Sequence, residues 1–145
     1  MRTRGFEAAV EGITLPKRAT KYSAGYDFFL NEDVLIPAKS TVVINTNVLS
    51  YMQDDEFLSI HIRSSFGIKR GLRLKNQVGI IDKDYYKNPS NGGVILVAIE
   101  NTTNADVALL KGEAFVQGIF MKYLLADTDE VTTTRSGGVG STSIE

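Results

Sequence analysis

The chain has 145 residues, 43% of them hydrophobic, with 16 basic and 17 acidic side chains and a net charge of −1. This length supports one domain with a sizeable core, and the balanced charge leaves no field that would hold a nucleic acid polymer. The lack of cysteine excludes disulfides, thiolate metal sites and a cysteine nucleophile, and no apolar run is long enough to span a bilayer, so we expect a soluble, cytoplasmic protein with no membrane partner.

Short runs of β-branched and aromatic residues, separated by Gly, Asn, Asp, Ser and Pro, are typical of an antiparallel all-β domain. In chain order the pattern predicts strands near Phe6 to Val10, Val34 to Ile36, Thr41 to Asn45, Phe57 to Arg63, Leu72 to Lys75, Val78 to Ile81, Val94 to Glu100 and Phe115 to Tyr123. In the fourth of these strands, Leu58, Ile60 and Ile62 alternate with Phe57, Ser59 and His61. We therefore expect one face of that strand to lie in the core.

One turn of helix is expected near Ser65 to Lys69, capped by Ser64 or Ser65 and stopped by Gly71. Arg63 and the two serines would bring a guanidinium, two hydroxyls and backbone amides together, a combination that binds phosphate oxygens. Taken alone, these residues are explained better by a surface arginine beside an ordinary helix cap.

The hairpin segment 76–87 combines two carboxylates and two aromatics with a glycine inside a strand. Gly79 would let a ligand or another backbone approach closely. Asp82 follows two isoleucines in a partly desolvated position, and it suits a general base and a turn residue equally well, whereas Asp84 suits a turn. Tyr85 fits stacking on a sugar or base, or simple cover of the hairpin.

Three further features bear on a possible site. The run from Asn91 to Gly93 is expected to be a plain connector. Gln117 interrupts an apolar strand, so its amide needs a partner, which can be a phosphate, a bound water or the backbone. His61 is the only histidine, so it is expected to be a strand-face residue without a zinc site.

The last stretch, residues 127–145, is small, polar and rich in glycine, so we expect a flexible arm after a β domain spanning residues 1–126. Arg135, the glycines after it, Ser141 and Thr142 supply a cation, backbone amides and hydroxyls that can wrap a phosphate.

The order of these clusters resembles the five motifs of the trimeric dUTPase family. The motifs are the segment 24–27 (Ala-Gly-Tyr-Asp), Arg63-Ser64-Ser65, the segment 79–85 (Gly-Ile-Ile-Asp-x-Asp-Tyr), Gly112-Glu113 with Gln117, and Arg135 with the glycine-rich segment 137–142. The match runs from about Gly5 to Ser143. Segments 4–7, 15–18 and 88–89 resemble the dUTPases of Gram-positive bacteria and their phages.

The resemblance implies a distorted jelly-roll β-barrel, a homotrimer with shared active sites, and hydrolysis of dUTP to dUMP and pyrophosphate. Such an enzyme limits uracil in DNA and supplies dUMP for thymidylate synthesis. Asp82 would deprotonate the water that attacks the α-phosphorus, and Tyr85 would exclude a 2′-hydroxyl. Asn76, Gly79 and Ile81 would bind uracil, while Arg63, Ser64, Ser65, Gln117, Arg135, Ser141 and Thr142 would hold the phosphates. Mg²⁺ would sit on the phosphates without a direct protein ligand, Asp27 acting at most through water.

The last motif departs from the family pattern, because Val139 stands where an aromatic residue commonly covers uracil. The uracil clamp is then expected to be weaker, unless Tyr86 or Phe66 replaces the missing ring. A dCTP deaminase of the same fold is disfavoured because Ala98 occupies the place of its glutamate. A nucleotide-sensing protein with a host protein partner, as phage dUTPases can be, stays open as a second role.

Overall fold

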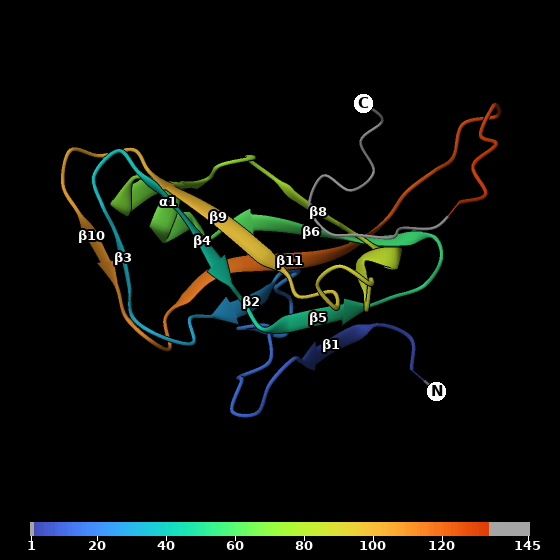
Figure 1. The fold of residues 1–145 in the computed structure, drawn as a ribbon, viewed down its shortest axis with the longest axis horizontal. Helices are drawn as coiled ribbons and strands as arrows, with labels where there is room; N and C mark the ends of the chain where they lie inside the picture. The colour runs from blue at the N-terminus through green and yellow to red at the C-terminus, as the bar shows by residue number, and fades with distance from the viewer. Residues whose placement is uncertain (1, 134–145) are drawn as a thin grey trace.

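The computed structural model describes residues 2–133, and it is built mostly from β-strands (Figure 1). The strands are β1 (Gly5–Ala8), β2 (Tyr26–Phe29), β3 (Val34–Ile36), β4 (Thr41–Asn45), β5 (Val48–Tyr51), β6 (Glu56–Ile62), β7 (Leu72–Leu74), β8 (Gly79–Asp82), β9 (Leu96–Asn101), β10 (Val107–Leu109) and β11 (Ala114–Lys122). The helix α1 (Ser64–Arg70) follows β6, and the 3-10 turn η1 (Lys83–Tyr85) follows β8.

All strand pairs are antiparallel, and two sheets carry the core. One sheet has the order β2-β11-β6-β8 and the other β4-β9-β7, while β1 pairs with β5 and β10 with β3. In Figure 1, β4 and β9 run across β6 and β11 at an angle, and both sheets contribute to one buried apolar cluster. The expected alternation in β6 is confirmed, since Leu58 and Ile60 are buried in that cluster. Each buried aliphatic side chain of this kind contributes about 1.5–3 kcal/mol.

Several predicted boundaries were wrong by one or two residues. The strand predicted over Phe57 to Arg63 runs from Glu56 to Ile62, because Arg63 already begins the helix. β2, β5 and β10 were not predicted, since each is only three or four residues long and too short for a clear alternation. The other expected strands are present with ends shifted by at most two residues.

The expected serine cap of the helix is also wrong. Arg63 is the N-cap residue in an extended conformation, and no side-chain hydrogen bond caps the helix. Instead the Arg63 carbonyl accepts bonds from the backbone N–H groups of Phe66 and Gly67. The predicted stop is confirmed, because Gly71 adopts a left-handed conformation with φ 67°.

The N-terminal strand is tied to the start of β6 by an ion pair. Arg4 Nε donates to both carboxylate oxygens of Glu56, at 3.1 and 2.9 Å. The backbone N–H of Gln53 donates to the same carboxylate. These bonds hold the pKa of the buried Glu56 carboxyl below its ordinary value, because the Arg4 hydrogen bonds favour the charged form.

Candidate active site

The predicted phosphate-binding residues gather where β6 ends and α1 begins. Arg63 Nη1 donates to the Ala114 carbonyl at 3.2 Å, and Arg63 Nε lies 3.7 Å from Asp27 Oδ1. Ser64 and Ser65 follow directly as the first two residues of the helix. The guanidinium is therefore anchored by β11 and kept near a carboxylate while 39% of its side chain stays exposed.

Asp27, Gln117 and His61 form a row across three neighbouring strands. Asp27 pairs with Gln117 in the β2–β11 ladder, and Gln117 pairs with His61 in the β11–β6 ladder. Paired residues point to the same face of a sheet, so these side chains lie side by side on the outer face. His61 is a strand-face residue as expected, and its Nε2 is 2.8 Å from Ser59 Oγ.

Gly25 makes room for the Gln117 side chain. A Cβ at Gly25 would lie 2.2 Å from Gln117 Oε1 and 3.0 Å from its Cβ and Cδ. Real Cβ atoms do not approach other atoms so closely. The glycine just before β2 is therefore required for the observed position of the amide.

The residues predicted to bind the nucleoside line a single cavity of about 580 Å³ between the β8 hairpin and the β4–β9 sheet. Its walls include Asn76, Gly79, Ile81, Asp82 and Tyr85, together with apolar residues of β4 and β9. This volume is in the range of small-molecule sites. The structure thus brings together every hairpin residue that the sequence singled out as substrate-binding or catalytic.

Within the hairpin, alternation decides which side chains face the core. Ile81 pairs with Leu58 and is buried, whereas the next residue, Asp82, pairs with Phe57 on the outer face and is exposed. The partly desolvated position expected for Asp82 was therefore wrong for a single chain. At Gly79 the close neighbour is a side chain, because a Cβ there would lie 3.0 Å from the Cβ of Ile60.

Tyr85 covers the hairpin with a ring that is 5% exposed, and a loop holds it in place. Its hydroxyl donates to the Val94 carbonyl at 2.9 Å and accepts from Asn91 Nδ2 at 2.9 Å. The segment from Asn91 to Gly93 is therefore more than the plain connector that the sequence suggested. Two asparagines spaced three residues apart before paired glycines were the available signal for a structured turn.

The two groups of residues lie far apart within one chain. Along β6, the partner of Asp82 is Phe57 and the partner of Gln117 is His61. Four residues of strand and two strand spacings correspond to about 13 Å and about 10 Å, and therefore to a Cα separation of about 16 Å between Asp82 and Gln117. In Figure 1, α1 lies at one end of β6, and β8 leads to the turn at its other end.

The described part of the chain holds no group of three or more acidic or histidine side chains that could bind a metal ion. Asp27 is a carboxylate beside the predicted phosphate-binding residues, since its Oδ1 lies 3.7 Å from Arg63 Nε. A single half-buried carboxylate fits an ion that is carried mainly by phosphate oxygens and water. None of the described helices is long and apolar enough to cross a membrane.

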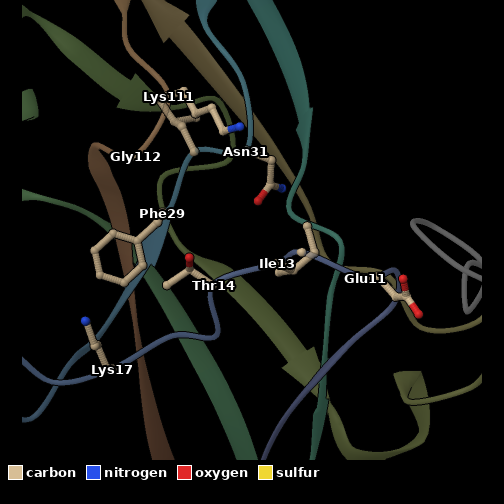
Figure 2. A pocket seen from close by; sticks show the side chains of 10 residues that line it. Glu11, Ile13, Thr14, Lys17, Phe29, Asn31, Lys111 and Gly112 are labelled. Carbon is tan, nitrogen blue, oxygen red and sulfur yellow. The ribbon is translucent and has the colours of Figure 1, made fainter.

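A second hollow of similar volume, about 580 Å³, lies on another part of the surface (Figure 2). Its walls come from the loop before β2, from Phe29 and Asn31, and from the turn at Lys111 and Gly112. It includes none of the predicted catalytic or substrate-binding residues. The predicted residues of the arm, Arg135, Ser141 and Thr142, together with Val139, lie outside the described residues.

Comparison with known proteins agrees with this set of motifs. The dUTPase family model matches residues 11–143. The chain belongs to the dUTPase family. It is 45% identical over 148 residues to the deoxyuridine 5′-triphosphate nucleotidohydrolase of Lactococcus lactis, covering 98% of this chain and 99% of that protein. The chain is accordingly a dUTP nucleotidohydrolase, an enzyme of nucleotide metabolism.

Solved dUTPase structures share the fold. The dUTPase of Streptococcus mutans superposes with a TM-score of 0.78 at 46% identity, covering 85% of this chain and 98% of that one. A Staphylococcus bacteriophage 80alpha dUTPase mutant solved with dUpNHpp gives a TM-score of 0.75 at 18% identity over 92% of this chain and 98% of that one, a likeness of fold alone. The expected dUTPase family and the resemblance to Gram-positive dUTPases are confirmed. These matches exclude the dCTP deaminase alternative.

Of the rings considered as substitutes over uracil, Phe66 is not available in this dUTPase chain. Phe66 is 4% exposed and belongs to the core cluster. The Tyr86 hydroxyl donates to Glu7 Oε1 at 2.7 Å, which directs that ring toward the N-terminal strand. The suggestion that Phe66 replaces the missing aromatic of the last motif was therefore wrong, and the same suggestion for Tyr86 stays a prediction.

Proposed function

We propose that dUTP is bound and hydrolysed at a site assembled from at least two copies of the chain in a homotrimer. The observation that carries this proposal is the separation of about 16 Å between Asp82 and Gln117. A base must reach its water directly or through one further water, so Asp82 and the phosphate-binding residues have to meet around one triphosphate. Within one chain they lie four strand residues and two strand spacings apart, on opposite sides of β6. The hairpin of one copy beside Arg63 and Gln117 of another satisfies the requirement.

The rim of the hairpin cavity also supports a neighbouring copy. Val43, Ile80 and Leu96 are large apolar residues that lie at this cavity, and they are 65%, 55% and 38% exposed. Contiguous apolar surface of this kind marks an interaction site. Packing of a second copy here would bury the rim and place Asp82 in the drier environment that its chemistry needs. We further propose that the sheets close into a distorted jelly-roll barrel and that residues 127–145 form a separate arm.

In this site Asp82 takes a proton from the water that attacks the α-phosphorus, and the P–O bond to the leaving pyrophosphate breaks. Tyr85 packs against the deoxyribose, so a ribose 2′-hydroxyl has no room. Asn76 and the backbone around Gly79 and Ile81 hydrogen-bond the uracil edge. These polar groups reject a base that leaves them unpaired more sharply than an apolar pocket can.

The second copy holds the phosphates of this dUTP through Arg63, Ser64, Ser65 and Gln117. The γ-phosphate end is closed over by Arg135, Ser141 and Thr142. Asp27 is the residue that would reach Mg²⁺ through water, and the ion would supply charge neutralisation of the phosphates. Arg63 is anchored to the Ala114 carbonyl, so its charge is already oriented before substrate arrives. Preorganised charge of this kind lowers the barrier without reorganisation during the reaction.

The test is Mg²⁺-dependent pyrophosphate release from dUTP, with dCTP, dTTP and UTP alongside and Asp82→Asn as the matched variant. We expect release from dUTP alone, and at least a hundredfold loss of kcat in the variant with little change in dUTP binding. An Asp82→Asn enzyme that keeps wild-type turnover would remove Asp82 from the mechanism.

A further inference from the structure

The hydroxyl of Tyr85 is fixed by two hydrogen bonds at the buried end of the ring. It donates to the Val94 carbonyl at 2.9 Å and accepts from Asn91 Nδ2 at 2.9 Å. The backbone carbonyl of Tyr85 accepts from Asn88 Nδ2 at 2.8 Å. The residue is therefore held at both ends by the loop that follows it.

Asn91 is itself held in one orientation. Its Oδ1 accepts from Asn88 Nδ2 at 2.8 Å and from the backbone N–H of Gly93 at 2.9 Å. Asn88 is 4% exposed, and its Oδ1 accepts from the backbone N–H groups of Ser90 and Asn91. With both Oδ1 bonds made, the Asn91 amide nitrogen can only point toward the Tyr85 hydroxyl and the Val94 carbonyl.

The loop conformation depends on Gly93. Its φ is +92°, and a Cβ there would lie 2.4 Å from the Lys87 backbone nitrogen and 2.9 Å from the Tyr85 carbonyl oxygen. Backbone atoms cannot move aside as the end of a long side chain can. The segment 88–93 is thus a rigid support, and within it the Asn91 side chain donates to the Tyr85 hydroxyl.

We propose that Asn91 is a positioning residue for Tyr85 and thereby a determinant of the preference for deoxyribose over ribose. The inference rests on the proposed function, in which Tyr85 packs against the sugar. A ring excludes a 2′-hydroxyl only while it cannot move, because a displacement of about 1 Å is enough to change rates substantially. Asn91 holds the far end of the ring, so its loss lets the ring shift without removing the ring.

The test compares kcat/KM for dUTP and for UTP in the wild type, Asn91→Ala, Tyr85→Phe and the double variant. Asn91→Ala removes one hydrogen bond of the Tyr85 hydroxyl, and Tyr85→Phe removes both that bond and the one to Val94. Each is expected to lower the dUTP/UTP ratio about tenfold or more, and the double variant should lower it no further than Tyr85→Phe alone. Asn31→Ala is the matched control, because Asn31 Nδ2 donates to the Thr46 carbonyl at 3.0 Å in a loop outside the proposed site. Its ratio should equal the wild-type ratio.

If Asn91→Ala does not fold, Asn91→Ser is used, since its hydroxyl can accept from the Gly93 N–H but is too short to reach the Tyr85 hydroxyl. A wild-type ratio in a folded Asn91 variant would overturn the inference, as would losses that simply add in the double variant. Tyr85→Ala distinguishes a failure of the role of Asn91 from a failure of the proposed role of Tyr85. An unchanged ratio in Tyr85→Ala would show that the ring does not touch the sugar, and the proposed function of Tyr85 would fail together with the inference.

Discussion

Replacing Gly25 by alanine is expected to damage catalysis without unfolding the protein. The added Cβ would lie 2.2 Å from Gln117 Oε1, more than 1 Å closer than the 3.4 Å at which ordinary contact begins. The clashing oxygen is the end of a flexible side chain, so the amide can rotate away while the backbone stays in place. The Gln117 amide would then leave its place in the row with Asp27 and His61.

The magnitude follows from this displacement. A misplacement of about 1 Å in a substrate-positioning group costs up to about a hundredfold in rate, so we expect Gly25→Ala to lower kcat/KM for dUTP by about 10- to 100-fold. The free energy of unfolding should fall by about 1 kcal/mol or less, because the side chain can relax. Pyrophosphate release gives the first quantity, and urea unfolding gives the second.

Two further variants make this prediction decisive. Gly12→Ala is the control for backbone strain, since Gly12 has φ +81° with open space around it and lies outside the proposed site. It should lose stability and keep kcat/KM. The double variant Gly25→Ala/Gln117→Ala should be no worse than Gln117→Ala alone, because the clash acts through Gln117. Wild-type kcat/KM in Gly25→Ala, or a double variant far worse than Gln117→Ala, would refute the reasoning.

Three other outcomes are expected. The pKa of Glu56 is lowered from its ordinary value of about 4.5, so the contribution of its carboxylate to stability is complete above about pH 4.5 and is lost as the pH falls below it. The difference in urea midpoint between wild type and Glu56→Gln should therefore shrink below about pH 4.5, and a constant difference would contradict this. Asn101→Ala removes a fully buried amide that bonds the Ile36 and Ala105 carbonyls, so unfolding free energy should fall by about 2–4 kcal/mol in urea titrations. Gly93→Ala places a Cβ against backbone, so its melting temperature should fall well below that of Gly12→Ala in calorimetry, and equal values would show that the loop can yield.

The sequence predicted the all-β class and most strands because alternation over five or more residues is a local property. β6 is the clearest case, with Leu58 and Ile60 on the core side. The strands that were missed carry too few residues for alternation to be seen, and β2 forms because β11 offers a long partner. The residues of a short segment do not by themselves determine a long-range strand pairing of this kind.

The candidate site was predictable in its residues and only partly in its geometry. The hairpin residues do line one cavity, but the exposure of Asp82 depends on which face β8 turns outward. The role of Asn91 was missed because its hydrogen bond with Tyr85 depends on a loop conformation that Gly93 permits. The distance between Asp82 and Gln117 depends on strand register, which motif order along the chain does not reveal.

Complementation between two inactive variants tests the shared site most directly. Asp82→Asn and Arg63→Gln are purified separately, mixed in equal amounts, unfolded and refolded together, and assayed for pyrophosphate release from dUTP. If Asp82 and Arg63 act from different copies, random assembly gives an intact pair at about a quarter of the sites, and activity should return to about 25% of wild type. Activity in the refolded mixture no higher than that of each variant alone would show that both residues act from the same chain and would contradict the account.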